Sequence, residues 1–207
     1  MNTKEKIVSK SLFLFNKFGF INVRLQHIAD ESEMSVGNLA YHFKNKDAIM
    51  EHLLSQIQKK QNELLAELRI VPIFENINEH LKSTYTIQRE YSFFYTDTLE
   101  ILRSYPLLKP IYRNHAFWFR EQIRLMITFN VARGAFKTLS HDMDAKMLSD
   151  SYWKQLELSF YKARLLGLMD YSEADFVKEA WFVLIPHFTD VGEKEYFQLL
   201  RKGNLNW

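Results

Sequence analysis

The chain has 207 residues, which is enough for one sizeable hydrophobic core or two small ones. Hydrophobic residues make up 47% and charged residues 25%, and these proportions are ordinary for a folded soluble protein. The absence of cysteine excludes disulfide bonds and metal sites built on thiolates. No apolar run is long enough for a signal peptide or a membrane-spanning helix, so we expect a cytoplasmic protein without a membrane partner.

Positive charge is concentrated near the N-terminus. Residues 1–60 contain nine Lys or Arg against six Asp or Glu, whereas residues 61–207 contain eighteen against nineteen. The formal net charge of the whole chain is +2. A basic excess in one part of a chain favours contact with nucleic acid there, although this asymmetry is mild and weak support by itself.

The pattern of apolar residues predicts a first helix that begins at Thr3, which can cap it, and ends at Phe18, before Gly19. The stretch from Phe20 to Asp47 then predicts two short helices joined by a tight turn, followed by the start of another helix. Leu25, Ile28 and Ala29 form the apolar edge of the first short helix. The apolar side of the second carries Val36, Leu39, Ala40 and Phe43.

This arrangement is the helix-turn-helix pattern, whose second helix can lie in the major groove of DNA. Gly37, Asn38 and Tyr41 are left on the side away from the core, so we expect them to face the groove. Asn38 can make a bidentate contact to adenine. The alternative is a three-helix packing unit that never touches nucleic acid.

We expect phosphate contacts from Ser35, Tyr41, His42 and Lys46. Such contacts position a protein on DNA without specifying the sequence. Arg24 completes the predicted DNA-binding set. Ser35 can also cap the second short helix. Lys46 lies at a helix start, where the dipole disfavours a cation, so a structural role explains it poorly, whereas a phosphate bound there would be held well. For His42 the alternative is a hydrogen-bonded histidine at the edge of the unit.

One set of positions in this region agrees with a known pattern: Ile7, Leu14, Phe15, Gly19, Phe20, Ile28, Ala29, Ser35, Gly37, Leu39, His42, Phe43 and Lys46. In order and spacing they resemble the DNA-binding domain of the TetR (tetracycline-repressor-like) transcription regulators, over residues 4–55. The resemblance implies a homodimer that binds double-stranded DNA at a palindromic operator. It also implies a larger helical domain that encloses a small-molecule effector.

Three departures from the family pattern bear on the DNA contacts. The turn contains Ser32-Glu33-Met34 where the family usually has small-Gly-Val, so Glu33 must adopt a left-handed conformation or reshape the turn. Ala40 stands where the family usually has a Tyr, for which Tyr41 can substitute. Arg24 stands where Thr or Ser usually caps the first short helix.

Beyond the helix-turn-helix the sequence predicts an all-α chain, with about nine helices in total. Asn45 can cap a linking helix over residues 46–69, which contains no Gly or Pro and is expected to move as a rod. Further helices are expected over residues 74–104, from Pro106 and Pro110 toward Gly134, from Asp142 or Asp144 to Leu166, and over residues 173–185 and 193–201. We expect a DNA-binding domain over residues 1–47 and an effector-binding and dimerisation domain over residues 48–207.

Aromatic side chains are dense in the second of these domains, and core packing explains most of them. A ligand pocket needs apolar walls with a few placed polar groups. Six residues together supply this mixture of large apolar surfaces and polar tips. They are the candidate effector contacts: Tyr91, Tyr95, His115, Trp118, Gln122 and Trp153.

In the resembled family the last two long helices pair with their counterparts in a dimer. The corresponding helices here are expected over residues 144–166 and 173–185. Their apolar candidates for the interface are Tyr152, Leu156, Phe160, Ala163, Trp181, Leu184 and Phe188. Burial within one subunit is the alternative for each of them.

Sequence motifs for catalysis are lacking. None of the seven histidines has a Glu three positions before it, and neither G-x-S-x-G nor H-E-x-x-H occurs. We therefore expect no enzyme activity, no cofactor and no metal. The sequence predicts a ligand-responsive transcription regulator, most simply a repressor that an effector releases from its operator. The alternatives are a helical small-molecule or lipid-binding protein that has lost DNA binding, favoured by Glu33 and Ala40, and a regulator controlled by a protein partner.

Overall fold

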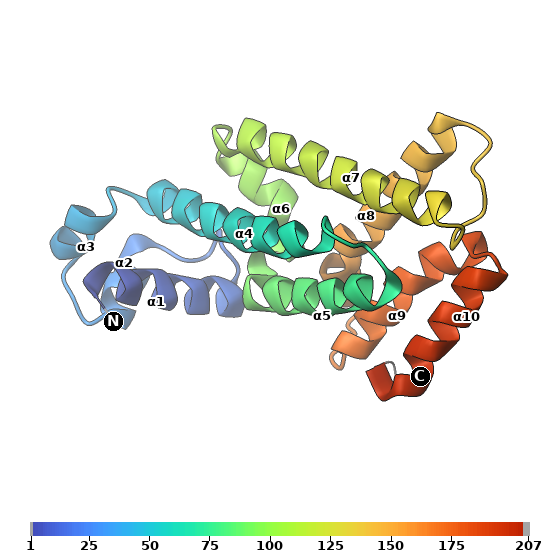
Figure 1. Cartoon of the computed structure of the whole chain (residues 1–207). Coiled ribbons are helices and arrows are strands. Elements are labelled where there is room, and N and C mark those ends of the chain that lie inside the picture. The colour runs from blue at the N-terminus through green and yellow to red at the C-terminus, as the bar shows by residue number, and fades with distance from the viewer. Residues whose placement is uncertain (1, 205–207) are drawn as a thin grey trace.

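The computed structural model describes residues 2–204, and its architecture is all-α, as the sequence predicted (Figure 1). The described part contains α1 (Thr3–Phe18), α2 (Leu25–Glu31), α3 (Val36–His42), α4 (Lys46–Leu68), α5 (Phe74–Glu90), α6 (Ser92–Ser104), α7 (Leu108–Ala132), α8 (Asp142–Leu165), α9 (Glu173–Leu184) and α10 (Asp190–Leu199). No helix in residues 2–204 combines the length and the apolar run needed to cross a bilayer.

Helix starts follow the capping residues of the sequence. The Asn45 Oδ1 atom accepts a hydrogen bond from the Ala48 N–H at 3.0 Å, as expected for the start of α4. Ser172 and Asp175 form the capping box of α9. The first helix is capped by Asn2 and not by Thr3, because Asn2 and Glu5 exchange the two hydrogen bonds of a capping box.

The prediction of a single helix over residues 74–104 is wrong, because the helix is interrupted at Tyr91 and forms α5 and α6. No Gly or Pro marks the break. The Asn16 side chain of α1 accepts hydrogen bonds from the Ser92 hydroxyl and the Phe93 N–H, both at 3.1 Å. A contact from 76 positions away thus replaces the partner that an unbroken helix would supply. The break accounts for the tenth helix.

The linking helix α4 is continuous over 23 residues, which confirms the expected unbroken helix. Figure 1 shows it extending from the end of the molecule that holds α1–α3 to the side of α5. Its first half, with Leu53, belongs to the core of the N-terminal helices, and its second half, with Leu65, belongs to the larger core around Trp181. The N-terminal core also contains Phe93 and Phe94 of α6, so packing joins α6 to the helix-turn-helix.

The C-terminal helices are shaped by one proline and one threonine. The helix α9 ends at Leu184, and Pro186 lies in the short 3₁₀ turn that follows, as the loss of a backbone donor requires. The helix α10 begins at Asp190, earlier than expected, because the Thr189 hydroxyl accepts a hydrogen bond from the Gly192 N–H at 3.3 Å. The backbones at Phe136 and Phe188 form an isolated antiparallel bridge beside it.

Candidate DNA-reading surface and effector cavity

The helix-turn-helix is held by a small, fully covered core. Ile28 and Ala29 of α2 and Leu39 of α3 are completely buried. The small side chain of Ala29 permits the close approach of α3, which contacts α2 along this edge. Ser35 caps α3, because its hydroxyl accepts a hydrogen bond from the Asn38 N–H at 3.1 Å. The orientation of α3 is therefore fixed by packing on one side and by a cap at its start.

The turn between α2 and α3 keeps its tight geometry although glycine is absent. Glu33 takes the left-handed conformation, with φ of 56°. Its N–H donates to the Asp30 carbonyl and the Met34 N–H to the Ala29 carbonyl, each at 3.0 Å. The Lys6 ammonium lies 2.8 Å from the Glu33 carboxylate and lowers the pKa of that carboxyl. Of the two outcomes expected for this residue, the structure shows the left-handed one.

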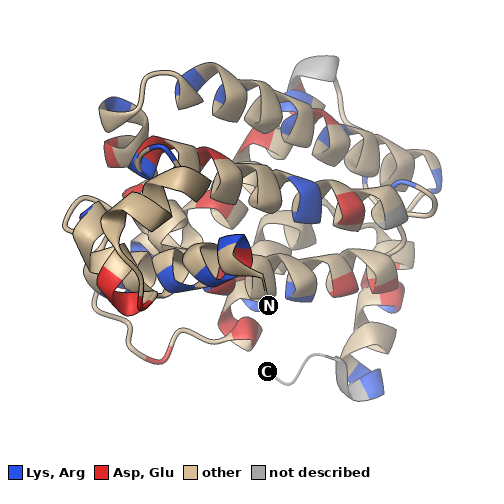
Figure 2. Ribbon diagram, turned by 90° about the vertical axis from the view of Figure 1, so that its left-hand side faces the viewer, with Lys and Arg blue, Asp and Glu red and all other residues tan. Residues whose placement is uncertain are grey.

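The far side of α3 is exposed in the described part of the chain and is available for DNA. Gly37 and Asn38 are exposed, and Tyr41 is 86% exposed. A methyl group added at Gly37 would have only the Ser35 hydroxyl within 4 Å, at 3.9 Å. Folding therefore does not explain why a glycine stands there. Figure 2 views the molecule from this end and shows basic and acidic positions interspersed on the ribbons.

Arg24 and His42 are two further residues of the predicted DNA-binding set. Arg24 is exposed, and its N–H donates to the His27 Nδ1 atom at 3.2 Å, so His27 satisfies this N–H as the third helical residue of a capping box does. His42 is half-buried, with its ring edge-on to Tyr41 at a centroid distance of 5.2 Å. Ser35, which is also exposed, lies at the start of α3 and His42 at its end, whereas Arg24 precedes α2.

Lys46 has a structural role, contrary to the argument made from the helix dipole. Its ammonium donates to the Phe20 and Val23 carbonyls, both at 2.8 Å, and lies 4.2 Å from the centroid of the Phe20 ring. Partial burial lowers its pKa. The cation therefore ties the start of α4 to the loop between α1 and α2. A contact from Lys46 to phosphate stays a prediction, with one ammonium proton left to make it.

Sequence reasoning passed over Lys44, which lies between α3 and α4. Its side chain is exposed, and within residues 2–204 no hydrogen bond or ion pair involves it. A solvated cation directly after a groove-facing helix is the usual kind of phosphate contact. The signal was present in the sequence as a basic residue in the loop, but the neighbouring Lys46 matched a family position and Lys44 did not.

Three of the six expected effector contacts come together, and three do not. Tyr95, His115 and Trp153 line a closed cavity of about 10 Å³ between α4, α6, α7 and α8, with room for one water molecule. The other residues of this lining are Leu54, Ile57, Gln58, Gln61, Phe94, Tyr112, Ala116, Phe119 and Glu157.

Hydrogen bonds connect the polar groups of this lining. The Gln61 amide donates to the Tyr95 hydroxyl at 3.0 Å, and its oxygen lies 2.5 Å from the His115 Nε2 atom. The Tyr112 hydroxyl donates to the Glu157 Oε1 atom at 2.6 Å. Burial lowers the pKa of His115 to about 4, so the ring is neutral at pH 7 and Nε2 carries its proton toward the amide oxygen.

Gln61, Tyr112 and Glu157 were missed as candidates for this site. Gln61 interrupts the apolar spacing of α4, and Glu157 directly follows the buried Leu156 in α8. A polar residue on an otherwise buried helix face is a usable sequence signal. It identifies residues one at a time, however, and only the packing of four helices shows that they meet.

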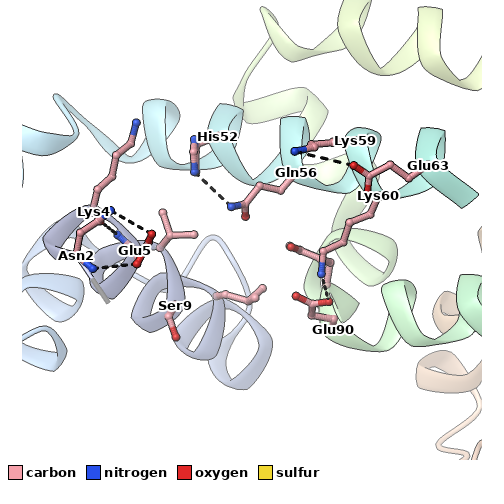
Figure 3. Close-up of a pocket in the computed structure, with 13 residues that line it drawn as sticks. Asn2, Lys4, Glu5, Ser9, His52, Gln56, Lys59, Lys60, Glu63 and Glu90 are labelled. Carbon is pink, nitrogen blue, oxygen red and sulfur yellow. Dashed lines mark hydrogen bonds and ion pairs between the residues drawn. The ribbon is translucent and has the colours of Figure 1, made fainter.

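The remaining three candidates lie elsewhere. Tyr91 lines an open groove of about 800 Å³ between α1, α4 and α5, and the Lys60 ammonium lies 5.3 Å from its ring centroid. Figure 3 shows this groove with Lys60 and Glu90 on one side of it. Trp118 is half-buried against the larger core, and the Gln122 amide donates to the Trp118 carbonyl at 3.5 Å. Neither Trp118 nor Gln122 is among the residues that line the closed cavity or the groove beside Tyr91.

The dimer-interface candidates on α8, on α9 and directly after Pro186 are buried within the subunit, with the exception of the half-buried Phe160. The buried residues are Tyr152, Leu156, Ala163, Trp181, Leu184 and Phe188. For these side chains the alternative of burial in one subunit is the correct one. Helical periodicity located the apolar face of each helix, but that face is directed toward the core.

Comparison with known proteins identifies the N-terminal part. The family model described as "Bacterial regulatory proteins, tetR family" matches residues 7–53. A probable HTH-type transcriptional regulator of Bacillus subtilis, YttP, is 34% identical over 65 residues. That match covers 31% of this chain and 31% of the relative, so it extends over less than a third of the relative's length.

The resemblance of the structures extends over the whole chain. A TetR-family transcriptional regulator from Marinobacter aquaeolei superimposes with a TM-score of 0.84 and 25% identity and covers 100% of both chains. A gamma-butyrolactone receptor, described as ArpA-like, superimposes with a TM-score of 0.72 at 16% identity, over 98% of this chain and 96% of the other, and shows the fold alone. The matched family model identifies residues 7–53 as a DNA-binding domain of the TetR family, and the whole chain has the fold of a TetR-family transcriptional regulator.

Proposed function

We propose that this protein is a repressor that binds a palindromic operator as a homodimer and leaves it when a small-molecule effector binds. The exposed face of α3 carries the proposal: Gly37, Asn38 and Tyr41 lie uncovered on a helix whose other face is fixed in a core. A rigid helix of this kind is what the major groove accepts. In this proposal residues 1–47 read DNA and residues 48–207 bind the effector and dimerise.

An exposed apolar surface supports the dimer. Leu165 of α8 is 69% exposed, and Phe182 of α9 is 59% exposed. The two helices are held together by the ion pair between Lys162 and Glu179. Large apolar side chains that remain exposed on neighbouring helices mark a protein contact. We propose that these residues, and not the buried set expected from periodicity, meet their counterparts in the partner subunit.

The small-molecule part of the proposal is supported by the cavity around His115. It lies between four helices and is lined by aromatic rings together with a few connected polar groups, which is the composition of ligand sites. One protein of the same fold is named a gamma-butyrolactone receptor. We propose that this chain also responds to a small molecule and that Tyr95, His115 and Trp153 lie at or beside its site.

The test is selection of bound fragments from the source genome with the purified full chain, followed by titrations at several salt concentrations. We expect the selected fragments to bind far more tightly than random DNA, with two half-sites and a linear loss of log affinity with log salt. Asn38→Ala should weaken binding to the selected fragments, whereas Asn62→Ala, exposed on α4, is the matched control. Equal affinity for selected and random DNA would favour the helical small-molecule-binding alternative.

A further inference from the structure

A second hollow lies directly outside the closed cavity. It is a groove of about 500 Å³ between α6, the start of α7 and α8. The cavity and the groove share four lining residues: Tyr95, Tyr112, Trp153 and Glu157. The hydrogen bond from the Tyr112 hydroxyl to Glu157 belongs to this shared wall. The groove has the size of a small-molecule site, whereas the cavity behind the wall has room for a single water.

Glu157 places a buried carboxyl group in the wall, and no cation in residues 2–204 forms an ion pair with it. Only 8% of its surface is exposed. Burial raises the pKa of its carboxyl, since the charged form loses water without gaining a counter-ion. The groove adds Asp97 and Glu100 against Arg103 alone. The site therefore carries three carboxyl groups and one guanidinium.

Aromatic rings complete the chemistry of the groove, whose lining includes Tyr95, Tyr112, Trp153 and Tyr161. The faces of such rings attract cations, and the attraction grows when water is excluded. We propose that the groove binds a lipophilic organic cation, whose charge pairs with Glu157 while its apolar body lies against these rings. The inference rests on the proposed function and adds to it the chemical class of the effector.

The position of the groove explains how such a ligand would act. A cation at Glu157 competes with the Tyr112 hydroxyl, so binding weakens the hydrogen bond in the shared wall and gives access to the cavity behind it. One side of the groove is α6, and the first residues of α6 are hydrogen-bonded to Asn16 of α1. A ligand between α6 and α8 therefore bears on the helix that contacts the DNA-reading part.

The test compares two ions of nearly the same size and shape but opposite charge, tetraphenylphosphonium and tetraphenylborate, by isothermal titration of the full chain without DNA. We expect the phosphonium to bind about tenfold more tightly or better, the effect of one desolvated cation–π and carboxylate contact. Glu157→Gln should abolish that preference while still accepting the hydrogen bond from Tyr112. The matched control is Glu63→Gln, at an exposed position on α4 outside the groove. This variant should keep the preference for the phosphonium ion.

Equal binding of the two ions to the unmodified chain, or a preference that survives in Glu157→Gln, would overturn the inference. The comparison on the unmodified chain decides the matter even when the variant fails to fold. Because no DNA is present, this result is independent of the operator selection, which tests the proposed function itself. A phosphonium that binds the groove yet leaves the protein on its selected DNA would overturn the assignment of the groove as the effector site.

Discussion

Gly37 is a residue at which folding and DNA binding make opposite demands. Glycine within a helix costs about 1 kcal/mol relative to alanine, and the space beside Gly37 is open, so folding would favour a larger residue. Close approach of a DNA backbone to α3 would favour glycine. We expect Gly37→Ala to raise the free energy of unfolding by about 0.5–1 kcal/mol and to weaken DNA binding. Urea unfolding and titration with the selected fragments measure the two effects, and unchanged DNA affinity would show that α3 does not approach DNA at this point.

Lys46 combines a structural contact with a proposed DNA contact, and the two can be separated. We expect Lys46→Ala to lower the free energy of unfolding by about 1–3 kcal/mol, because the Phe20 and Val23 carbonyls lose a charged donor. We also expect it to reduce the slope of log affinity against log salt by about one. The exposed Lys44→Ala should reduce the slope alone, without a loss of stability. An unchanged slope in Lys46→Ala would assign this residue wholly to the fold.

At the scale of elements, Asn16 sets the boundary between α5 and α6. Its amide donates to the Glu90 carbonyl at 2.8 Å, and its oxygen accepts from the Ser92 hydroxyl and the Phe93 N–H. We expect Asn16→Ala to lower the free energy of unfolding by about 1–3 kcal/mol, because backbone groups at the break lose their partners. Denaturant unfolding measures this, with Asn62→Ala, exposed on α4, as the control. A variant as stable as the control would mean that the break is set by the packing of Phe93.

The extent to which the sequence predicts these elements depends on how local each cause is. Caps act over three residues, and the ones expected at Ser35, Asn45 and Ser172 are present. The break at Tyr91 depends on a residue in α1, so no window along the chain contains its cause. The same reason explains the candidate site. Helix periodicity separates buried from exposed residues, but the meeting of Tyr95 with His115 depends on how four helices cross.

At the scale of the molecule, the buried His80 and the half-buried His115 make stability depend on pH. Burial lowers the pKa of His80 and of His115 to about 4, while an unfolded histidine titrates near 6.5. Between these values the unfolded chain binds more protons, so stability is complete above pH 6.5 and falls as the pH is lowered toward 4. Complete titration of His80 alone corresponds to about 3 kcal/mol. Glu157 opposes this trend, because its raised pKa favours the folded state as the pH falls toward 4.5.

Urea unfolding between pH 7 and pH 4.5 measures this dependence. We expect His80→Gln to be less stable than the unmodified chain at pH 7 but to lose less stability on acidification. Asn62→Ala, exposed on α4, is the control and should follow the unmodified chain at every pH. Parallel curves for the His80 variant and the unmodified chain would contradict the assignment of the acid sensitivity to this buried ring.

The unbroken α4 predicts how an effector signal reaches DNA. A helix without a hinge moves as a rod. A shift at the end of α4 that packs into the larger core therefore changes the separation of the two α3 helices in a dimer. These two helices must meet major grooves that are about 34–36 Å apart, or a multiple of that distance. The chain lacks cysteine, so Tyr41→Cys carries a single spin label per subunit. We expect a compound that releases the selected DNA to change the distance between these labels. Labels at Asn62→Cys are the control and should move less, and a fixed distance at position 41 would exclude the rod mechanism.

The participation of α6 in the N-terminal core has a consequence for protein engineering. The Phe93 ring lies 5.3 Å from Phe15 and 6.3 Å from Phe20, measured between centroids, so the helix-turn-helix is completed by a residue far outside it. A chimaera that grafts residues 1–47 onto another regulator would leave these two rings facing a foreign side chain. Interchangeable DNA-reading heads would therefore require the start of α6 to be transplanted together with them.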